Sequence, residues 1–157
     1  MLAIPRLRSM ARFLTVGGVA AMLLLGRGAA VAEPLYEIDY ATYDVRVTDS
    51  KAVVTDAKDF GFLSGPNILE ALRGDAIVEI PFRRISTIEV GAYVPEKGIS
   101  PCVVTTHQGK RYDLTLDRNQ GQRFLGGDAE FGNYRIRLMQ IGKLELKGLS
   151  HADRAAP

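Results

Sequence analysis

The sequence predicts an all-β protein, and three observations support this prediction. From residue 33 onward, glycine or proline recurs about every ten residues, which is typical of short strands joined by turns. Between these breaks, apolar and polar residues alternate with the period of two that marks strands with one buried face. A thirteen-residue stretch of this kind, residues 78–90, has a second copy at residues 134–146. We therefore expect a duplicated chain of two small antiparallel β-barrel halves, and the sequence leaves open whether they share one core.

The two copies share apolar positions more than identical residues. Three pairs are identical: Ile80/Ile136, Ile85/Ile141 and Glu89/Glu145. The apolar positions between these pairs are matched in kind, for example Phe82 by Leu138. A second likeness precedes each copy, LRGDA at residues 72–76 and LGGDA at residues 125–129. Internal similarity of this extent predicts a repeated structural unit.

Residues 1–32 are expected to be a cleaved secretory signal rather than part of the fold. They contain a basic start with Arg6, Arg8 and Arg12, an uncharged apolar run, and an Ala-Val-Ala cleavage site at residues 30–32. The apolar run is shorter than the roughly 20 residues that a membrane-spanning helix needs. We expect the mature chain to be exported, to the periplasm or the cell exterior, and to lack a transmembrane segment. A retained membrane anchor is the alternative.

Removing this segment reverses the net charge. The whole chain has 20 basic and 18 acidic side chains, and four arginines but no acid lie in residues 1–32. The remaining residues therefore have a net charge of −2. This balance gives no support to nucleic acid or an anionic membrane as a partner.

The first half is expected at residues 33–95. Tyrosine and isoleucine alternate with acidic residues at 36–40, and tyrosine and valine alternate with charged residues at 43–47, which predicts two strands. A third strand is expected around Val53. Residues 66–73 fit a strand or a short helix, and comparison with the second copy favours a strand.

The repeated stretch predicts its own sequence of elements. Gly74-Asp75 suits a two-residue hairpin turn before it. Within residues 78–90 the apolar spacing changes from two to three and back, which predicts a strand, one helical turn and a further strand. The helical turn should place Ile85 in the core. Pro81 has no N–H and is therefore expected at a sheet edge or facing solvent.

The second half is expected at residues 96–149. It opens with a hairpin made of strands at 103–106 and 111–116, followed by a polar hairpin loop at 117–121. The second copy of the repeated stretch then completes five short strands with a helical turn before the last. Residues 150–157 are polar and alanine-rich, so a disordered tail is expected.

This order of elements resembles small barrels of the Sm-like kind. Ile80–Glu89 is also similar to a repeat, I-P-[FL]-x-x-I-x-x-I-E, found in exported bacterial proteins of unassigned function. The second copy departs from it by Arg137 in place of proline and Leu144 in place of isoleucine. The resemblance implies a fold and assigns no active-site residue, since small barrels have many unrelated functions.

The residues that usually perform catalysis or hold metals are sparse. His107 and His151 are far apart and have no acid at ligand spacing, and residues 117–121 only partly match a calcium-binding loop. Cys102 lies in a β-favouring run and is expected to be a buried thiol, with an intermolecular disulfide as the alternative. We expect no metal and no cofactor. Whether the protein is an enzyme is uncertain, and a non-catalytic role is favoured.

Two groups of residues are candidates for binding. Arg83, Arg84, Arg135 and Arg137 could form a cationic strip, although outward charges on strands usually serve solvation and protection of edges. Tyr36, Tyr40 and Tyr43 could form a stacking platform, although tyrosines at strand spacing more often belong to a core. Asp75 and Asp128, taken as equivalent positions, are expected to serve turns.

These observations favour a non-catalytic binding or scaffolding module of the cell envelope. It would recognise a protein partner through an exposed strand edge or through loops. The alternative is a protein that binds a small ligand, a sugar or a metabolite, with the tyrosine face. A hydrolase with an unrecognised site is a third hypothesis. Pairing of strand edges between chains would give a homo-oligomer.

Overall fold

Ten strands, two 3₁₀ turns and one four-residue helix occur within residues 38–150, the part of the chain that the computed structural model describes. The strands are β1 (Tyr43–Asp49), β2 (Val54–Phe62), β3 (Ile68–Arg73), β4 (Ala76–Pro81), β5 (Ile85–Val90), β6 (Ile99–Thr106), β7 (Arg111–Asp117), β8 (Phe124–Ala129), β9 (Gly132–Arg137) and β10 (Ile141–Leu149). The 3₁₀ turns are η1 (Phe82–Arg84) and η2 (Leu138–Gln140), and the helix is α1 (Arg118–Gly121). The all-β prediction is confirmed.

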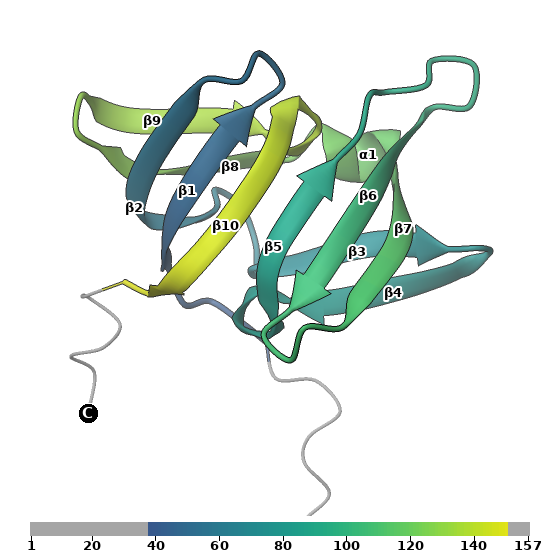
Figure 1. Ribbon diagram of the computed structural model, residues 1–157, viewed down its shortest axis with the longest axis horizontal. Coiled ribbons are helices and arrows are strands. Elements are labelled where there is room, and N and C mark those ends of the chain that lie inside the picture. Colours follow the sequence, from purple (N-terminus) through teal and green to yellow (C-terminus); the bar gives the residue numbers. More distant parts are fainter. Residues whose placement is uncertain (1–37, 151–157) are drawn as a thin grey trace, which may run out of the picture. The chain divides into compact units, whose positions relative to one another are not determined.

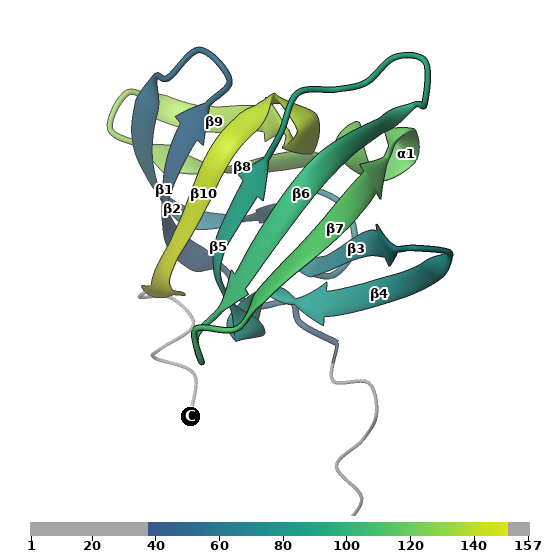
Figure 2. The ribbon, with the colours of Figure 1, turned by 45° about the vertical axis from the view of Figure 1, so that its right-hand side comes forward.

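The strands form one antiparallel sheet in the order β4-β3-β7-β6-β5-β10-β1-β2-β8-β9. Figure 1 shows β5 and β10 side by side at the centre, with β6 and β7 on one side and β1 and β2 on the other. The β3–β4 and β8–β9 hairpins run crosswise to these strands, as Figure 2 also shows. The sheet therefore begins and ends on the outer strand of a hairpin.

The elements of the second half follow those of the first at a distance of 56 residues. β3, β4, η1 and the start of β5 correspond in this way to β8, β9, η2 and the start of β10. Equivalent backbone hydrogen bonds accompany them, since the Phe82 N–H donates to the Asn67 carbonyl and the Leu138 N–H to the Arg123 carbonyl, both at 2.9 Å. That this likeness arose by duplication of an Sm-like barrel stays a prediction.

Strands of the two sequence halves are interleaved in the sheet. β5 pairs with β6, and β10 pairs with β1, so the fifth strand of each half lies beside the first strand of the other. β3 likewise pairs with β7, and β2 with β8. The strand order can be divided between β5 and β10 into two parts of five strands. Each part contains strands from residues 33–95 and strands from residues 96–149.

One hydrophobic core serves both halves. Val47 and Phe60 from the first half and Leu116 and Leu144 from the second belong to the same buried cluster, and each has an exposed fraction of 0%. Ile85 is fully buried directly after η1, as its spacing predicted. The question of a shared core is thus answered, because the interleaved strands place apolar side chains of both halves together.

Several predictions for individual segments are confirmed. Residues 68–73 form a strand, and Gly74-Asp75 form the two-residue turn between β3 and β4. Pro81 ends β4, which is an edge strand. The hairpin of β6 and β7 also forms, with the turn at 107–110.

The likeness between LRGDA and LGGDA does not correspond to equivalent positions. Leu69 pairs with Ile80 and Leu125 pairs with Ile136, so the true offset is 56 residues and not the 53 that those letters imply. Asp75 lies in a turn, but Asp128 lies in β8 opposite Asn133. The prediction that Asp128 serves a turn is therefore wrong, because the turn after β8 falls two residues later.

Two other segment predictions are wrong. Residues 38–40 are not part of a strand, because the Asp39 carboxylate accepts the Ala41 N–H at 3.1 Å and closes a local turn instead. Tyr36 lies outside the described residues. The expected hairpin loop at 117–121 is the helix α1, whose start is capped by Asp117 through a hydrogen bond from the Gln120 N–H at 2.8 Å.

Candidate functional site

The two outer strands, β4 and β9, each have one side without a strand partner among residues 38–150. The Leu138 N–H points toward the β8 side, to the Arg123 carbonyl. Because backbone groups alternate in direction along an antiparallel strand, those of Asn133, Arg135 and Arg137 point away from β8. We call these three residues the β9 edge.

The same reasoning defines the edge of β4. The Phe82 N–H donates to the Asn67 carbonyl on the β3 side. The backbone groups of Ile77, Glu79 and Pro81 therefore point away from β3, and we call these residues the β4 edge. Pro81 contributes no N–H. On the β9 edge, Asn133 and Arg135 each have an outward N–H, whereas the Arg137 N–H donates to Gln140 Oε1 at 3.4 Å.

The side chains beside the β9 edge are basic and apolar. Arg135 and Arg137 are exposed, and the Arg137 guanidinium lies over the Phe124 ring at 5.1 Å from its centroid. Leu63 and Arg135 cover Gly126, since a Cβ there would lie 2.8 Å from Leu63 Cδ2 and 3.4 Å from Arg135 Cγ. Leu63 and Phe124 have exposed fractions of 50% and 46%. These four side chains, Leu63, Phe124, Arg135 and Arg137, form what we call the β9 patch.

Arg123, which directly precedes β8, holds neighbouring backbone segments together beside this patch. Its guanidinium lies 3.6 Å from the centroid of the Phe62 ring and donates to the carbonyls of Ile68 at 3.2 Å and Ser64 at 3.3 Å. Burial lowers its pKa, and the nearby Glu70 carboxylate acts in the opposite direction. Arg123 therefore ties the segment before β8 to the segment before β3.

The four candidate arginines do not form one strip. Arg83 and Arg84 lie in η1, directly after β4, whereas Arg135 and Arg137 lie on β9. β4 and β9 are at opposite ends of the strand order. The interleaving of strands, which no local sequence pattern reveals, separates the two pairs.

The two tyrosine candidates within the described residues, Tyr40 and Tyr43, lie beside one hollow but differ in exposure. Tyr43 is in the core with an exposed fraction of 3%, and its hydroxyl donates to Asp39 Oδ2 at 2.6 Å. Tyr40 has an exposed fraction of 67% and lines an open hollow of about 470 Å³. Arg83, His107 and Leu149 contribute to the same hollow. Tyr43 also borders this hollow, but because it is almost fully buried, Tyr40 alone of these two tyrosines presents an exposed ring there.

Two buried polar residues that sequence reasoning missed support this hollow. Asp39 Oδ2 also accepts the Arg83 N–H at 3.0 Å. The Asn67 side chain accepts the Phe62 N–H and donates to the Ala41 carbonyl, both at 2.6 Å. These bonds fix residues 39–41 to η1 and β2. The 56-residue offset could have directed attention to Asn67, because it corresponds to Arg123, which ties together the same region of the other half.

The described residues contain little that could perform catalysis or hold a metal. No group of three or more His, Cys, Asp or Glu residues within 38–150 is arranged to bind a metal ion. Cys102 has an exposed fraction of 1%, and burial raises the pKa of its thiol to about 12, so the reactive thiolate is disfavoured. Over the same residues, no helix has the length and apolar character needed to span a membrane.

Comparisons with known proteins assign no family to the chain. No model of a known protein family matches it, and a search of curated proteins finds no similar sequence. The features that indicate a function are therefore the outer strand β9, the side chains beside it and the hollow at Tyr40.

Proposed function

We propose that this protein is a non-catalytic binding or scaffolding module of the cell envelope that recognises a protein partner through the β9 edge. The observation that carries this proposal is that the sheet ends on β9, where the N–H and carbonyl groups of Asn133 and Arg135 are directed outward. An extended segment can add to such an edge as a further strand, since the edge supplies both N–H donors and carbonyl acceptors.

The β9 patch gives this edge a chemical preference. Backbone hydrogen bonds supply affinity in strand addition, and side chains supply specificity. Arg135 and Arg137 would favour carboxylates on the partner, and the exposed Leu63 and Phe124 would contact its apolar side chains. The partner segment is therefore expected to be extended, acidic and partly apolar.

The proposed location follows from the sequence. Residues 1–32 have the basic start, apolar run and small-residue site of a secretory signal, which supports export to the periplasm or beyond. The similarity of Ile80–Glu89 to a repeat of exported bacterial proteins supports the same location.

The test compares two proline variants in pulldowns from envelope extract. Arg135→Pro removes an outward N–H from the β9 edge, whereas Glu79→Pro removes one at the equivalent position of the β4 edge. We expect the wild-type protein and Glu79→Pro to capture the same envelope protein and Arg135→Pro to lose it. Capture of the same protein by folded Arg135→Pro would refute recognition through the β9 edge.

The second candidate function is binding of a small ligand, a sugar or metabolite, in the hollow at Tyr40. The exposed Tyr40 ring and the cationic Arg83 line this hollow together with His107, which favours a ligand with an apolar face and an anionic group. A thermal-shift screen tests it, and a stabilising compound should lose its effect in Tyr40→Ala. A screen in which no compound raises the melting temperature would count against this function.

A further inference from the structure

An open hollow of about 370 Å³ lies where the start of β8 meets the segment between β2 and β3. Its lining combines cationic, polar and apolar side chains: Leu63, Ser64, Gln122, Arg123, Phe124 and Arg135. Three other hollows within residues 38–150 each include acidic side chains, for example Asp39, Asp56 and Glu70. The hollow beside β8, which we call the arginine hollow, is lined by two cations and by no anion.

Arg123 forms no ion pair with an acid within the part of the chain that the structure describes. Its Nη atoms donate at 3.2–3.4 Å to four neutral oxygens, which belong to the Ile68, Ser64 and Pro66 carbonyls and the Gln120 side chain. The nearby Glu70 carboxylate instead accepts a hydrogen bond from Gln120 Nε2 at 2.7 Å. A partly buried charge without an opposite charge in contact is unfavourable. An anion in the arginine hollow would therefore stabilise Arg123.

Arg135 supplies hydrogen-bond donors to the same hollow. Its side chain lies over Gly126, since a Cβ there would lie 3.4 Å from Arg135 Cγ. Among residues 38–150 no group forms a hydrogen bond or an ion pair with the Arg135 guanidinium. A guanidinium has five N–H donors in a planar fork, which matches the two oxygens of a carboxylate. Arg135 can therefore bind a carboxylate directly, while the charge of Arg123 adds attraction.

Leu63 and Phe124 indicate what the carboxylate is attached to. Both side chains line the hollow and are about half exposed, with exposed fractions of 50% and 46%. An alkyl or aryl group on the ligand would cover them and remove apolar surface from water. A phosphate fits less well, because it has more oxygens than one fork can satisfy and the Nη atoms of Arg123 are already engaged.

We propose that the arginine hollow binds a carboxylate attached to an apolar group, with Arg135 as the direct donor and Arg123 as a fixed cation beside it. This inference goes beyond the proposed function, because a free carboxylic acid can occupy the hollow without pairing with the backbone of β9. The end of a peptide chain and an acidic side chain beside an apolar residue both carry this chemistry. Different probes separate these two sources.

The test follows backbone amide signals by NMR in isotope-labelled protein expressed from the full chain. N-acetyl-leucine has a terminal carboxylate, acetyl-Leu-Glu-amide has a side-chain carboxylate, and N-acetyl-leucinamide has none. We expect the Ser64 and Phe124 amides to show saturable shifts with a carboxylate probe, with a dissociation constant in the millimolar range. N-acetyl-leucinamide should cause no such shifts. The carboxylate probe that binds more tightly identifies the source.

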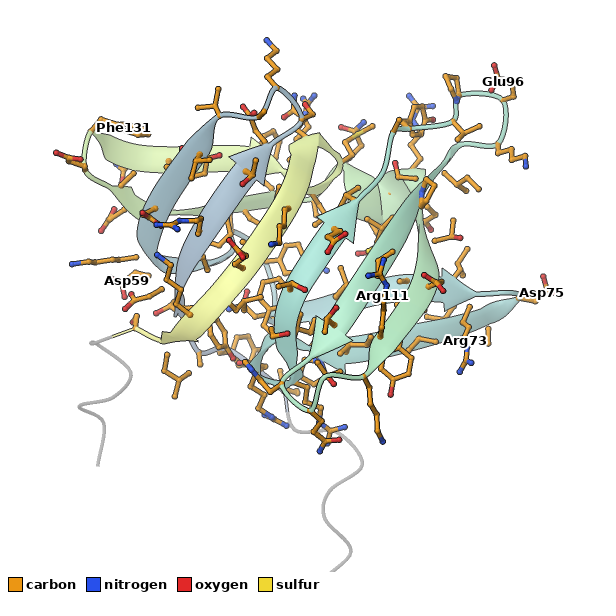
Figure 3. The ribbon with its side chains drawn as sticks, in the orientation of Figure 1. Asp59, Arg73, Asp75, Glu96, Arg111 and Phe131 are labelled. Carbon is orange, nitrogen blue, oxygen red and sulfur yellow. The ribbon has the colours of Figure 1, made fainter. Side chains whose placement is uncertain are left out.

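Variants test the role of each side chain. Arg135→Gln removes the guanidinium but keeps the backbone N–H, and it should weaken binding by about tenfold without lowering the melting temperature. Leu63→Ala should reduce the preference for N-acetyl-leucine over acetate. Arg111→Gln is the matched control, because it removes an exposed arginine from β7. Figure 3 shows Arg111 and Phe131, at the tip of the β8–β9 hairpin, on opposite sides of the central strands.

Each outcome decides the inference. Equal binding of N-acetyl-leucine and N-acetyl-leucinamide, or unchanged binding in Arg135→Gln, would overturn the carboxylate site. Shifts confined to Tyr40 and His107 would assign the ligand to the other hollow and would also overturn it. A protein that captures an envelope protein, loses it in Arg135→Pro and binds no carboxylate probe would refute this inference alone. Carboxylate binding by a protein that captures no envelope protein would support this site and count against strand addition.

Discussion

Ile88 on β5 lies directly opposite Leu144 on β10, and the two residues occupy equivalent positions 56 residues apart. On either side of this pair, Thr87 lies opposite Glu145 and Glu89 lies opposite Lys143. These pairs exchange when the two halves exchange, so an approximate twofold axis passes between Ile88 and Leu144. The junction of the halves is therefore a buried strand pair, whereas the equivalent outer strands β4 and β9 are left at the two ends.

Truncation at this junction should destabilise the whole sheet. Ile88 and Leu144 both have exposed fractions of 0%, so Ile88→Ala or Leu144→Ala should lower the free energy of unfolding by about 2–5 kcal/mol. Urea unfolding measures this and should show one transition, because both halves share the core. Ile77→Ala, at an exposed site, should change stability little. Two separate transitions in the wild-type protein would contradict a shared core.

Replacing Gly127 by alanine should be strongly destabilising. A Cβ at Gly127 would lie 2.4 Å from the Lys58 carbonyl oxygen and 2.9 Å from Phe60 Cα, because β2 bulges toward it around Asp59. We expect a loss of about 1–3 kcal/mol or more, measured by thermal or urea unfolding. Gly91→Ala is the control, since its nearest contact, Pro101 Cβ at 3.4 Å, is an ordinary one. Equal stabilities of the two variants would contradict the close approach of β2.

Removing the Asn67 side chain should leave two buried backbone groups unsatisfied. The Phe62 N–H and the Ala41 carbonyl are its partners, and each should cost about 1–3 kcal/mol when left without a replacement. Chemical denaturation of Asn67→Ala against the exposed control Asn119→Ala measures the difference. Similar stabilities of these two variants would show that the network around Asn67 contributes little.

Acid should remove the contribution that Asp56 makes to the stability of the folded protein. The Arg46 guanidinium and the Lys147 amine hold the pKa of this carboxyl well below its ordinary value of 3.8. A lowered pKa in the folded state gives stability that is present above pH 3.8 and is lost as pH falls below it toward the folded-state pKa. Asp56→Asn should therefore be slightly less stable than the wild type at pH 7, and the gap should close below pH 3.8. A gap that widens on acidification would contradict this sign.

The buried thiol of Cys102 should resist alkylation. Its exposed fraction is 1% and its pKa is raised to about 12 by burial, so iodoacetamide at pH 8 should react only when the sheet opens. Mass spectrometry of labelled protein should show slow labelling that accelerates in urea. Rapid labelling of the folded protein, or a disulfide-linked dimer, would contradict this burial.

The sequence predicted those elements whose cause is local. Apolar alternation located β1, and the change of spacing around Ile85 located η1, because both depend on which face of a short segment is buried. Gly74-Asp75 located a turn for the same kind of reason. The similarity of LGGDA to LRGDA wrongly predicted a turn at Asp128. The glycine before it, Gly127, is required because β2 approaches closely there, and not because of a turn.

The candidate site was less accessible to prediction because it depends on pairing between distant strands. Arg135 and Arg137 were candidates as outward charges, but that they lie on a free edge follows only from β9 being last in the strand order. Tyr43 was a candidate binding residue but lies in the core, where its hydroxyl donates a hydrogen bond to the buried Asp39. Neither relationship is visible in the spacing of residues.

Amide hydrogen exchange at the β9 edge tests the central claim most directly, because the claim is that its outward N–H groups bind another strand. In dilute protein the amides of Asn133 and Arg135 should exchange rapidly, and the amide of the buried Leu144 slowly. With a captured partner bound, the account predicts that amide exchange at Asn133 and Arg135 slows by at least tenfold while exchange at Glu96 does not change. Exchange at Asn133 and Arg135 that is the same in the free and bound states would contradict the claim.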